Sequence, residues 1–543
     1  MKKIIYLILC LATFSCSNEN IGNDIPSNAQ EKSLASDNIS KEEQMELFAK
    51  SLSKAVYANQ EFRSFLKKEA LLKVDNDNDI FYPFSMNKKI QQRTFKDIIL
   101  QYGNNKKELS SIQDSIPLLN IHIPEYGNIR TADLEISNPE LPIIFENKIY
   151  LNGEIVDTLK AGEIPGFISL VVCQNNKLRK VASTRSSSVE DQYEFVSRCF
   201  DPSYNKTKAN IRTRSVVEYD EYSEKYDPQK GLVPRNNIDP ELIDAYNKTI
   251  KYKKGTRYVM YYGLNGIEDT PKSLRTDVSD CIFRFKISSD AFSRLKEIAE
   301  GDKKYLFSGT VSNKKNPLTD RDAILKSLMT GRAFCFVFQI QDDIKGEKIE
   351  SQRIKIYAMP NKLFNLRLDE YRRHPTMFRH TKYTYTIDAR QVKAKWFYPL
   401  ENDQDSRFDR WDITRDPVNK IVSVTLINPD EGFTKDITEK YSVTYLTKAG
   451  VGLDLKILPK IVNIGITGNF SSENTVTKEF TSKYQTTEHN EFIDKFDFNY
   501  FDDYPIEDVT SNGFVIPIRK GKGIIETSIL PISNKFYTIG IRQ

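Results

Sequence analysis

The spacing of apolar residues changes near residue 118 of this chain. Before that point they recur at helical intervals, as at Met45, Phe48, Leu52 and Val56. After it they alternate or form short β-branched runs, which is typical of strands, as in residues 118–123. Hydrophobic residues make up 39% of the 543 residues, which is enough for more than one core. The sequence therefore predicts a multidomain α+β protein whose helices come first.

Helix-capping signals support this order in the N-terminal part. Ser40 and Glu43 have the spacing of a capping box, and Thr94 with Asp97 repeats the pattern. A further helix is expected between them and ends before the acidic residues 75–79.

Two hairpins are expected after these helices, forming a small antiparallel sheet. Residues 148–159 carry Asn152-Gly153 near their centre, a strong short-range hairpin signal. Residues 166–173 and 178–182 predict a second hairpin, turned at residues 174–177.

The remaining chain is rich in predicted strands. Between residues 241 and 390 we expect helices at 291–299 and 320–328, and strands at 257–262, 281–287, 333–340, 353–358 and 383–387. After residue 391 the spacing favours a β-sandwich-like region with strands at 395–398, 421–427, 441–446, 453–458, 462–466, 515–518 and 524–530.

These patterns divide the chain into six segments. They are a signal peptide (1–15), a polar tether (16–39), an α+β domain (40–182), a linker or exposed segment (183–240), a mixed β-rich domain (241–390) and an all-β sandwich-like domain (391–543).

The N-terminus carries an export signal. Lys2 and Lys3 precede the apolar run of residues 4–12, which is too short to span a bilayer as a permanent helix. Thr13-Phe14-Ser15-Cys16 follows and resembles the lipobox of bacterial lipoproteins, although Thr13 departs from the usual aliphatic residue. The resemblance implies cleavage before Cys16, a diacylglyceryl thioether on its sulfur and a further acyl chain on its nitrogen. An ordinary secretory signal with a chance cysteine is the alternative.

The segment order is also similar to that of uncharacterised multidomain envelope lipoproteins of Gram-negative bacteria, a resemblance that implies no activity. The polar residues 17–38 would form a tether spanning roughly 25 Å. Glu19 and Asp24 give the tether a weak acidic bias, which resembles surface-export signals. We expect lipid anchoring, by preference to the outer membrane, on either the periplasmic or the surface-exposed face.

Charge argues against nucleic acid as a partner. The net charge is +5, and removal of Lys2 and Lys3 with the signal leaves +3 (5 − 2). The four cysteines after Cys16 (Cys173, Cys199, Cys281 and Cys335) allow three full pairings, but apolar surroundings favour buried thiols for most of them. Four scattered histidines and no CxxC argue against zinc.

No familiar catalytic motif is present: HExxH, G-x-S-x-G and Walker A patterns are all missing. The sequence therefore predicts no catalytic and no cofactor-binding residue, and it leans away from an enzyme.

One acidic motif offers ligands for a metal. Asp75, Asp77 and Asp79 alternate as in hard-oxygen Ca²⁺ sites. An EF-hand would need Gly and Glu where Ile80 and Met86 stand, so a solvated turn is the competing interpretation. Residues 401–412 and 497–508 are two more acidic segments, for which Ca²⁺ or stacking of sugars on neighbouring aromatic residues is an alternative to ordinary turns.

Residues 441–487 combine alternating apolar residues with a Ser/Thr-rich stretch. This composition resembles the amphipathic insertion hairpins of aerolysin-type pore-forming toxins. A plain solvent-faced antiparallel sheet gives the same pattern and is the preferred interpretation.

Taken together, these features predict a lipid-anchored cell-envelope protein with a binding or structural role toward a protein or glycan. A β-pore-forming protein that uses residues 441–487 and an envelope hydrolase without a recognisable motif are the alternatives.

Overall fold

The structure of the chain is a computed structural model. It describes residues 39–125, 129–159, 163–181, 189–203, 231–250, 255–266, 273–288, 331–345, 348–365, 368–374, 382–387, 393–402, 404–408, 410–412, 416, 419–427, 433–446, 475–487, 490–500, 504–521 and 524–536. Residues from Lys41 to Gln543 belong to one compact unit. The predicted cleavage site, Cys16 and residues 17–38 of the tether lie outside the described residues.

The N-terminal helices form where the capping signals place them. Helix α1 (Lys41–Ala58) buries Phe48, Leu52 and Val56, and Asn59 caps helix α2 (Gln60–Leu71) by accepting from the backbone N–H of Phe62. The capping box of Thr94 and Asp97 opens α4 (Phe95–Tyr102), as predicted. The other described helices of four or more residues are α3 (Tyr82–Ser85), α5 (Lys106–Ser110), α6 (Ile112–Ser115), α8 (Pro240–Thr249), α9 (Thr256–Tyr262) and α12 (Pro360–Leu363).

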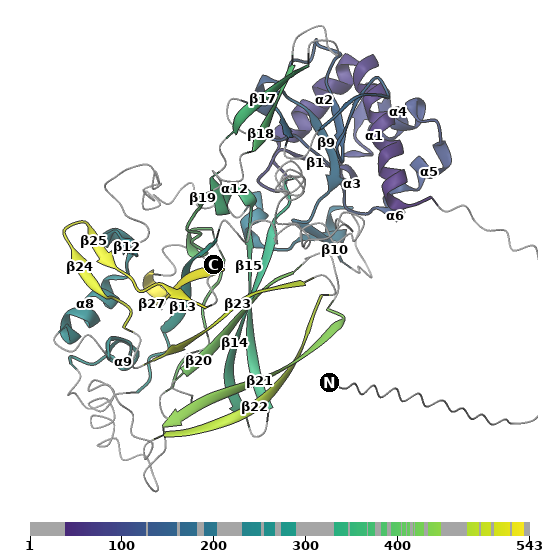
Figure 1. The fold of residues 1–543 in the computed structure, drawn as a ribbon. Coiled ribbons are helices and arrows are strands. Elements are labelled where there is room, and N and C mark those ends of the chain that lie inside the picture. Colours follow the sequence, from purple (N-terminus) through teal and green to yellow (C-terminus); the bar gives the residue numbers. More distant parts are fainter. Residues whose placement is uncertain are drawn as a thin grey trace, which may run out of the picture. The chain divides into compact units, whose positions relative to one another are not determined.

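A six-stranded sheet packs against these helices, in the order β1-β4-β9-β5-β6-β7. Its strands are β1 (Asp79–Phe81), β4 (Leu119–His122), β5 (Ile143–Phe145), β6 (Lys148–Leu151), β7 (Glu154–Thr158) and β9 (Leu170–Gln174). Helix α1 lies against β5, β6 and β9, and α2 lies against β1 (Figure 1). One apolar core fills the space between these helices and strands.

One predicted hairpin is confirmed and the other is wrong. Asn152 and Gly153 adopt positive φ and join β6 to β7. In contrast, β9 pairs with β4 and β5, whereas β10 (Leu178–Lys180) pairs with β11 (Tyr193–Phe195). The Asn175 side chain accepts from the backbone N–H groups of Lys177 and Leu178, and these bonds hold residues 174–177 as a polar bend.

Long antiparallel strands dominate the later chain. A four-stranded sheet has the order β15-β14-β20-β23, made of β14 (Phe334–Lys345), β15 (Lys348–Ala358), β20 (Asn419–Ile427) and β23 (Asn490–Asn499). Helices toward the N-terminus and strands toward the C-terminus confirm the α+β class. These strand pairs join the two segments predicted at residues 241–390 and 391–543. Strand β20 pairs with β14, and β13 (Val278–Ile287) pairs with β27 (Ile525–Ser533).

Smaller ladders complete the described strands. They are formed by β2 (Lys89–Ile90) with β3 (Arg93–Thr94), β8 (Glu163–Pro165) and β17 (Leu368–His374) with β18 (Lys382–Ile387), β12 (Leu232–Val233) and β24 (Asp508–Thr510) with β25 (Gly513–Val515), β16 (Phe364–Asn365) with β19 (Lys393–Ala394), β26 (Arg519–Lys520) with β27, and β21 (Lys435–Leu446) with β22 (Thr475–Thr486).

Three strand predictions are wrong. Of residues 515–518 only Val515 lies in a strand, β25, because Pro517 cannot donate to a ladder. Residues 257–262 form helix α9, between Gly255 and Gly263 in the left-handed conformation, and every residue of the helix is buried. Tertiary packing there overrides the β propensity of the aromatic residues. Residues 395–398 contribute only an isolated bridge from Phe397 to Phe285. The predicted elements at 291–299, 320–328, 453–458 and 462–466 lie outside the described residues.

Among the residues that the structure describes, no helix combines the length and the apolar character needed to cross a membrane.

Buried polar groups and aromatic rings join α9 and β13 to the four-stranded sheet. Asp280 accepts from Arg257 Nε at 2.9 Å and from the Tyr261 hydroxyl at 3.0 Å. Lys420, on β20, is fully buried, and its Nζ lies 5.7 Å from the centroid of the Tyr500 ring. Burial lowers the pKa of Lys420 to about 7.

We therefore predict that Lys420→Met stabilises the fold below neutral pH. The folded pKa is lower than the unfolded pKa, so the charged lysine costs stability most at and below pH 7. The free energy of unfolding at pH 6 should rise by about 1 to 3 kcal/mol. Denaturant titrations at several pH values would measure it. The gain should shrink as the pH rises toward 10, and a variant less stable than wild type at every pH would contradict the prediction.

Candidate functional site

The acidic motif at residues 75–79 forms a tight turn between α2 and β1. Asn76 adopts a left-handed φ of 65°, a conformation that asparagine tolerates well. The Asp75 carboxylate accepts from the backbone N–H of Asp77 at 3.3 Å, and the Asp77 carboxylate from that of Asn78 at 2.8 Å. These local bonds favour a turn over continuation of the helix.

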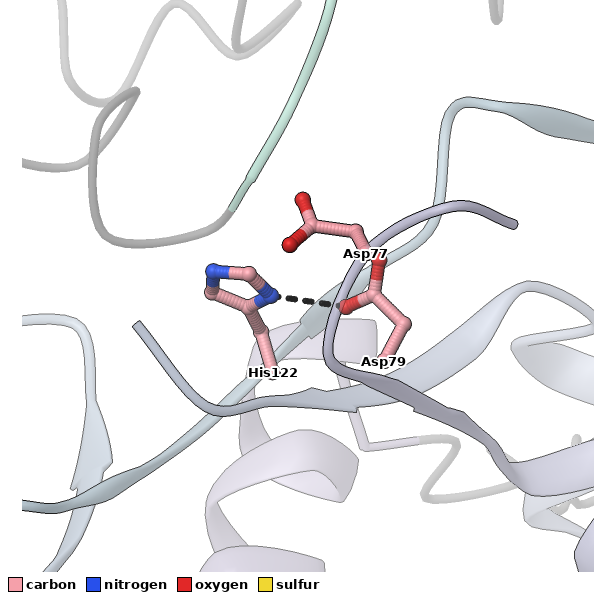
Figure 2. Close-up of side chains that lie close together, drawn as sticks. All are labelled: Asp77, Asp79 and His122. Carbon is pink, nitrogen blue, oxygen red and sulfur yellow. Dashed lines mark hydrogen bonds and ion pairs between the residues drawn. The ribbon is translucent and has the colours of Figure 1, made fainter. Parts of the chain in front are cut away.

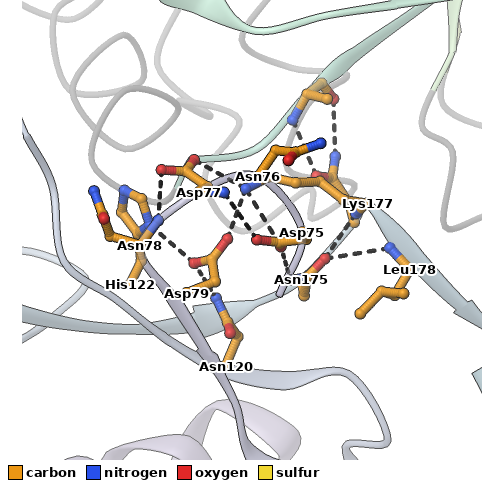
Figure 3. A network of polar contacts seen from close by, with 12 residues as sticks. Asp75, Asn76, Asp77, Asn78, Asp79, Asn120, His122, Asn175, Lys177 and Leu178 are labelled. Carbon is orange, nitrogen blue, oxygen red and sulfur yellow. Dashed lines mark hydrogen bonds and ion pairs between the residues drawn. The ribbon is translucent and has the colours of Figure 1, made fainter. Parts of the chain in front are cut away.

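Lys177 provides the positive charge at the centre of this turn (Figure 3). Its Nζ lies 2.6 Å from Asp79 Oδ2, 2.9 Å from Asp77 Oδ2 and 3.4 Å from Asp75 Oδ2. The Lys177 side chain is 3% exposed and those of Asp75 and Asp79 at most 1%, whereas that of Asp77 is 26% exposed. The ammonium therefore compensates two carboxylates that water does not reach.

Two strand residues complete the surroundings of Asp79. Asp79 Oδ1 accepts from Asn120 Nδ2 at 2.6 Å and contacts His122 Nδ1 at 2.9 Å (Figure 2). Both residues belong to β4, the neighbour of β1 in the sheet. Every short contact to Asp79 thus comes from a donor or a cation.

Burial and neighbouring charge act on each ionisable group of the cluster. Burial and the charge of Asp79 raise the pKa of Asp75 to about 7. Burial also opposes ionisation of Asp79, but the charges of Lys177 and His122 outweigh it and lower the pKa of Asp79. Burial works against the charged forms of His122 and Lys177, but the aspartates outweigh it and raise both pKa values. The cluster therefore holds an ionised Asp79 beside the Lys177 ammonium, and Asp79 in turn favours the protonated form of His122.

Chain segments from elsewhere close over the cluster. Asn176 clamps Ala333, donating to its carbonyl at 2.8 Å and accepting from its N–H at 3.0 Å. Gly331 has a φ of 64°, and a Cβ there would lie 2.8 Å from His122 Cε1, so the close approach requires glycine. The turn is thus a packed junction and not the solvated loop considered above.

The structure brings Asp75, Asp77 and Asp79, the three predicted metal ligands, together around the ammonium group of Lys177. Asp77, Asp79 and His122 each offer a ligand atom within 4.8 Å of the others. Lys177 contacts the same carboxylates, and a positive side chain in that place opposes a second cation. The residues therefore fit calcium poorly, and Ca²⁺ at Asp75, Asp77 and Asp79 stays a prediction.

Sequence reasoning missed His122 and Lys177. His122 lies in the apolar run of residues 118–123, where a histidine among β-branched residues signals a buried polar partner. Lys177 lies in a turn, where a lysine is ordinarily exposed. Only the pairing of β4 with both β1 and β9 reveals that these residues meet.

Residues 401–412 and 497–508, the other two acidic segments, contact each other through aromatic rings. Trp411 stacks on Tyr500 with ring centroids 4.2 Å apart, and both rings are buried. Phe408 and Phe498 pack beside them with a centroid distance of 5.8 Å. These aromatic residues belong to the core, and the proposed stacking of sugars on them is wrong.

The segment that resembled an insertion hairpin forms a long two-stranded ladder. Strands β21 and β22 pair in register from Lys435 opposite Thr486 to Leu446 opposite Thr475. Near its base, Arg353 of β15 lies 5.6 Å from the ring centroids of both Phe433 and Tyr484. Residues 447–474, which connect the two strands, lie outside the described residues.

Cys173, Cys199, Cys281 and Cys335, all among the described residues, form no disulfide bond. Cys173, Cys281 and Cys335 are buried in strands β9, β13 and β14, which confirms the buried-thiol interpretation for these three. Burial raises the pKa of Cys173 and of Cys335 to about 12, which makes them poor nucleophiles.

No protein-family model, no curated protein and no solved structure matches this chain. Its function must therefore be argued from its own residues.

The raised pKa of Asp75 predicts a stability profile that falls as the pH rises. Its folded pKa of about 7 exceeds its usual value of 3.8, so stability is lost between those values on going to higher pH. His122 acts in the same direction, because its raised pKa stabilises the fold most at low pH. Asp75→Asn keeps the neutral form, so its melting temperature should fall less than that of wild type from pH 5 to pH 8.

Asp77→Asn is the matched control for this measurement. It removes a partly exposed carboxylate that contributes less to the raised pKa of Asp75 than burial and Asp79 do, so its profile should lie closer to that of wild type than the Asp75→Asn profile does. Parallel profiles for all three proteins would contradict the assignment of the pH dependence to Asp75.

Proposed function

We propose that this chain is a lipid-anchored protein of the cell envelope that inserts the β21–β22 hairpin into a lipid bilayer. The register of that hairpin carries the proposal. It favours the membrane-inserting alternative over the binding role that the sequence alone suggested.

The register sorts the residues of the hairpin by polarity. Opposite residues of an antiparallel pair share a face, and successive residues alternate between faces. The register then places seven apolar or aromatic residues on one face, Ile437, Tyr441, Val443, Tyr445, Val476, Phe480 and Tyr484, with Lys435, Glu439, Lys478, Ser482 and Thr486 as exceptions. The other face holds Asp436, Thr438, Lys440, Ser442, Thr444, Thr475, Thr477, Glu479, Thr481, Lys483 and Gln485, with Leu446 as the apolar exception.

The length of the arms also suits a membrane. Each arm has 12 residues, and a tilted membrane-spanning strand needs roughly 9 to 11. An apolar face can meet lipid while the polar face meets water. Backbone groups at the outer edges of an inserted hairpin must also be paired, so insertion would involve several chains.

The anchor expected at Cys16 would assist insertion. Acyl chains on this residue would keep the protein at a membrane surface, where the local concentration of hairpin is high. A tether of roughly 25 Å would leave the folded part free to turn the hairpin toward the bilayer.

Binding and hydrolysis stay alternatives with less support. A glycan site loses its best candidates because Trp411 and Tyr500 are buried. Within the described part of the chain, the His122–Asp79 pair is a candidate for a hydrolase, but both side chains are at most 5% exposed.

Leakage of dye from liposomes tests the proposal. Val443→Asp places a carboxylate on the apolar face of the hairpin. Thr444→Asp, at the next residue, places the same charge on the polar face. A carboxylate on the lipid side costs insertion up to roughly 2 kcal/mol per chain, so leakage by Val443→Asp should fall at least about tenfold. Leakage by Thr444→Asp should stay within about twofold of wild type.

The lipid-anchored wild-type protein must itself release dye for the proposal to stand. Thermal melting of both variants would show that each is folded. Absence of leakage from wild type, or equal leakage by the two variants, would reject the membrane role and return the binding role to first place.

Arg353 and Lys355 predict how the hairpin is held before insertion. Arg353 contacts the rings of Phe433 and Tyr484, and Lys355 Nζ lies 4.6 Å from the Phe433 centroid. Each cation–π contact contributes about 0.5 to 1 kcal/mol, so the double variant Arg353→Gln, Lys355→Gln should leak roughly five times faster. Arg519→Gln removes a similar contact to Phe498, away from the hairpin, and should leave the rate unchanged. An unchanged leakage rate in the double variant would show that Arg353 and Lys355 do not hold the hairpin before insertion.

A further inference from the structure

Lys177 and Asp79 are arranged as an amine and a carboxyl group in position to react. The residues are 98 positions apart in the chain, and Lys177 Nζ lies 2.6 Å from Asp79 Oδ2. Their side chains are 3% and 1% exposed. We propose that Lys177 Nζ and Asp79 Cγ form an intramolecular isopeptide bond after folding, with release of one water molecule.

The surroundings of Asp79 would stabilise the charge that this reaction develops. Attack on Cγ places negative charge on the oxygen that does not leave. Asp79 Oδ1 already faces Asn120 Nδ2 at 2.6 Å and His122 Nδ1 at 2.9 Å, whereas Oδ2 faces the lysine. Two fixed donors at the position of a developing oxyanion are the recurring arrangement in acyl transfer.

Asp75 is placed to move the protons. Its Oδ2 lies 3.4 Å from Lys177 Nζ (Figure 3). Asn175 Nδ2 donates to the same oxygen at 2.7 Å and fixes its orientation. A buried carboxyl group in contact with the nucleophile can act as acid and as base.

The reaction needs no co-reactant. One ammonium proton passes from Nζ to Asp79 Oδ2, which leaves a neutral amine beside a carboxylic acid. Nζ then bonds to Cγ, and the negative charge collects on Oδ1. Asp75 takes a second proton from Nζ and delivers it to Oδ2, the Cγ–Oδ2 bond breaks, and water leaves. The product is a neutral amide with one N–H, and Asp75 returns to its starting state.

Proximity and burial favour this product. Fixed neighbours react as if at very high concentration, and a closed site does not return water to the amide readily. Lys177 Nζ lies against three carboxylates and must lose protons before it can react, so the bond should form slowly after folding. The link would tie the turn before β1 to the bend between β9 and β10, independently of the proposed membrane role.

Intact mass spectrometry of the purified full-length chain tests the proposal directly. The wild-type protein should be lighter than its processed sequence by the mass of one water molecule. Proteolysis should give a branched peptide that joins Asp79 to Lys177. A wild-type protein of full mass after prolonged incubation at pH 8, or a water loss mapped to another peptide, would overturn the proposal.

Variants separate the chemistry from mere folding. Lys177→Arg keeps the charge and removes the amine, so it should have full mass. Asp75→Asn keeps both reacting groups and should link at least about tenfold more slowly in a time course, because proton transfer is lost. Asp77→Asn removes a carboxylate that contacts Nζ but is not the proposed proton carrier, so it should link no more slowly than wild type. Equal linking rates in Asp75→Asn and Asp77→Asn would remove Asp75 from the mechanism, and a linked Lys177→Arg would overturn the assignment of the nucleophile.

Discussion

The ammonium of Lys177 is the charge on which the N-terminal sheet depends. Asp75 and Asp79 are fully buried beside the first strand, and carboxylates in that position strongly destabilise a fold unless a cation compensates them. Lys177 supplies the compensation from a bend that the sequence separates from them by about a hundred residues. The bend itself is held by Asn175, so β10 leaves β9 and pairs with β11. One buried cation therefore fixes both the acidic turn and the path of the chain after β9.

Local signals could be predicted wherever neighbouring residues decide the outcome. The capping box at Thr94 and the Asn152-Gly153 turn need only a few adjacent residues, and both form as expected. Residues 257–262 show the limit of such reasoning. Their aromatic side chains favour a strand, but Arg257 and Tyr261 must reach the buried Asp280, and the helix lets both do so. That requirement comes from β13, which no local window contains.

Only part of the candidate site could be predicted from the sequence, and the reason is the same. The alternation of Asp75, Asp77 and Asp79 is a local pattern, and the sequence identified it as a set of ligands. A metal ion was one interpretation of this pattern and a solvated turn the other, because Lys177 is about a hundred residues away in the chain. The pairing of β4 with β1 and β9 brings His122 and Lys177 to these aspartates. The long-range pairing of strands thus places a cation among the carboxylates. The site is a charge-compensated cluster and not an open set of carboxylates.

The acidic turn and the hairpin are held by interactions of different strength, and this difference supports the division of roles argued above. The turn at residues 75–79 is fixed by buried charges, which cannot separate without a large penalty. The base of the β21–β22 hairpin is held by the buried Tyr484 and by exposed cations over the rings of Tyr484 and Phe433, and these contacts involve no buried ion pair. The hydrogen bonds of the ladder itself run between β21 and β22, so they survive if the hairpin leaves β15. A segment that moves into a membrane needs this combination, because it must detach at low cost while keeping its backbone groups paired.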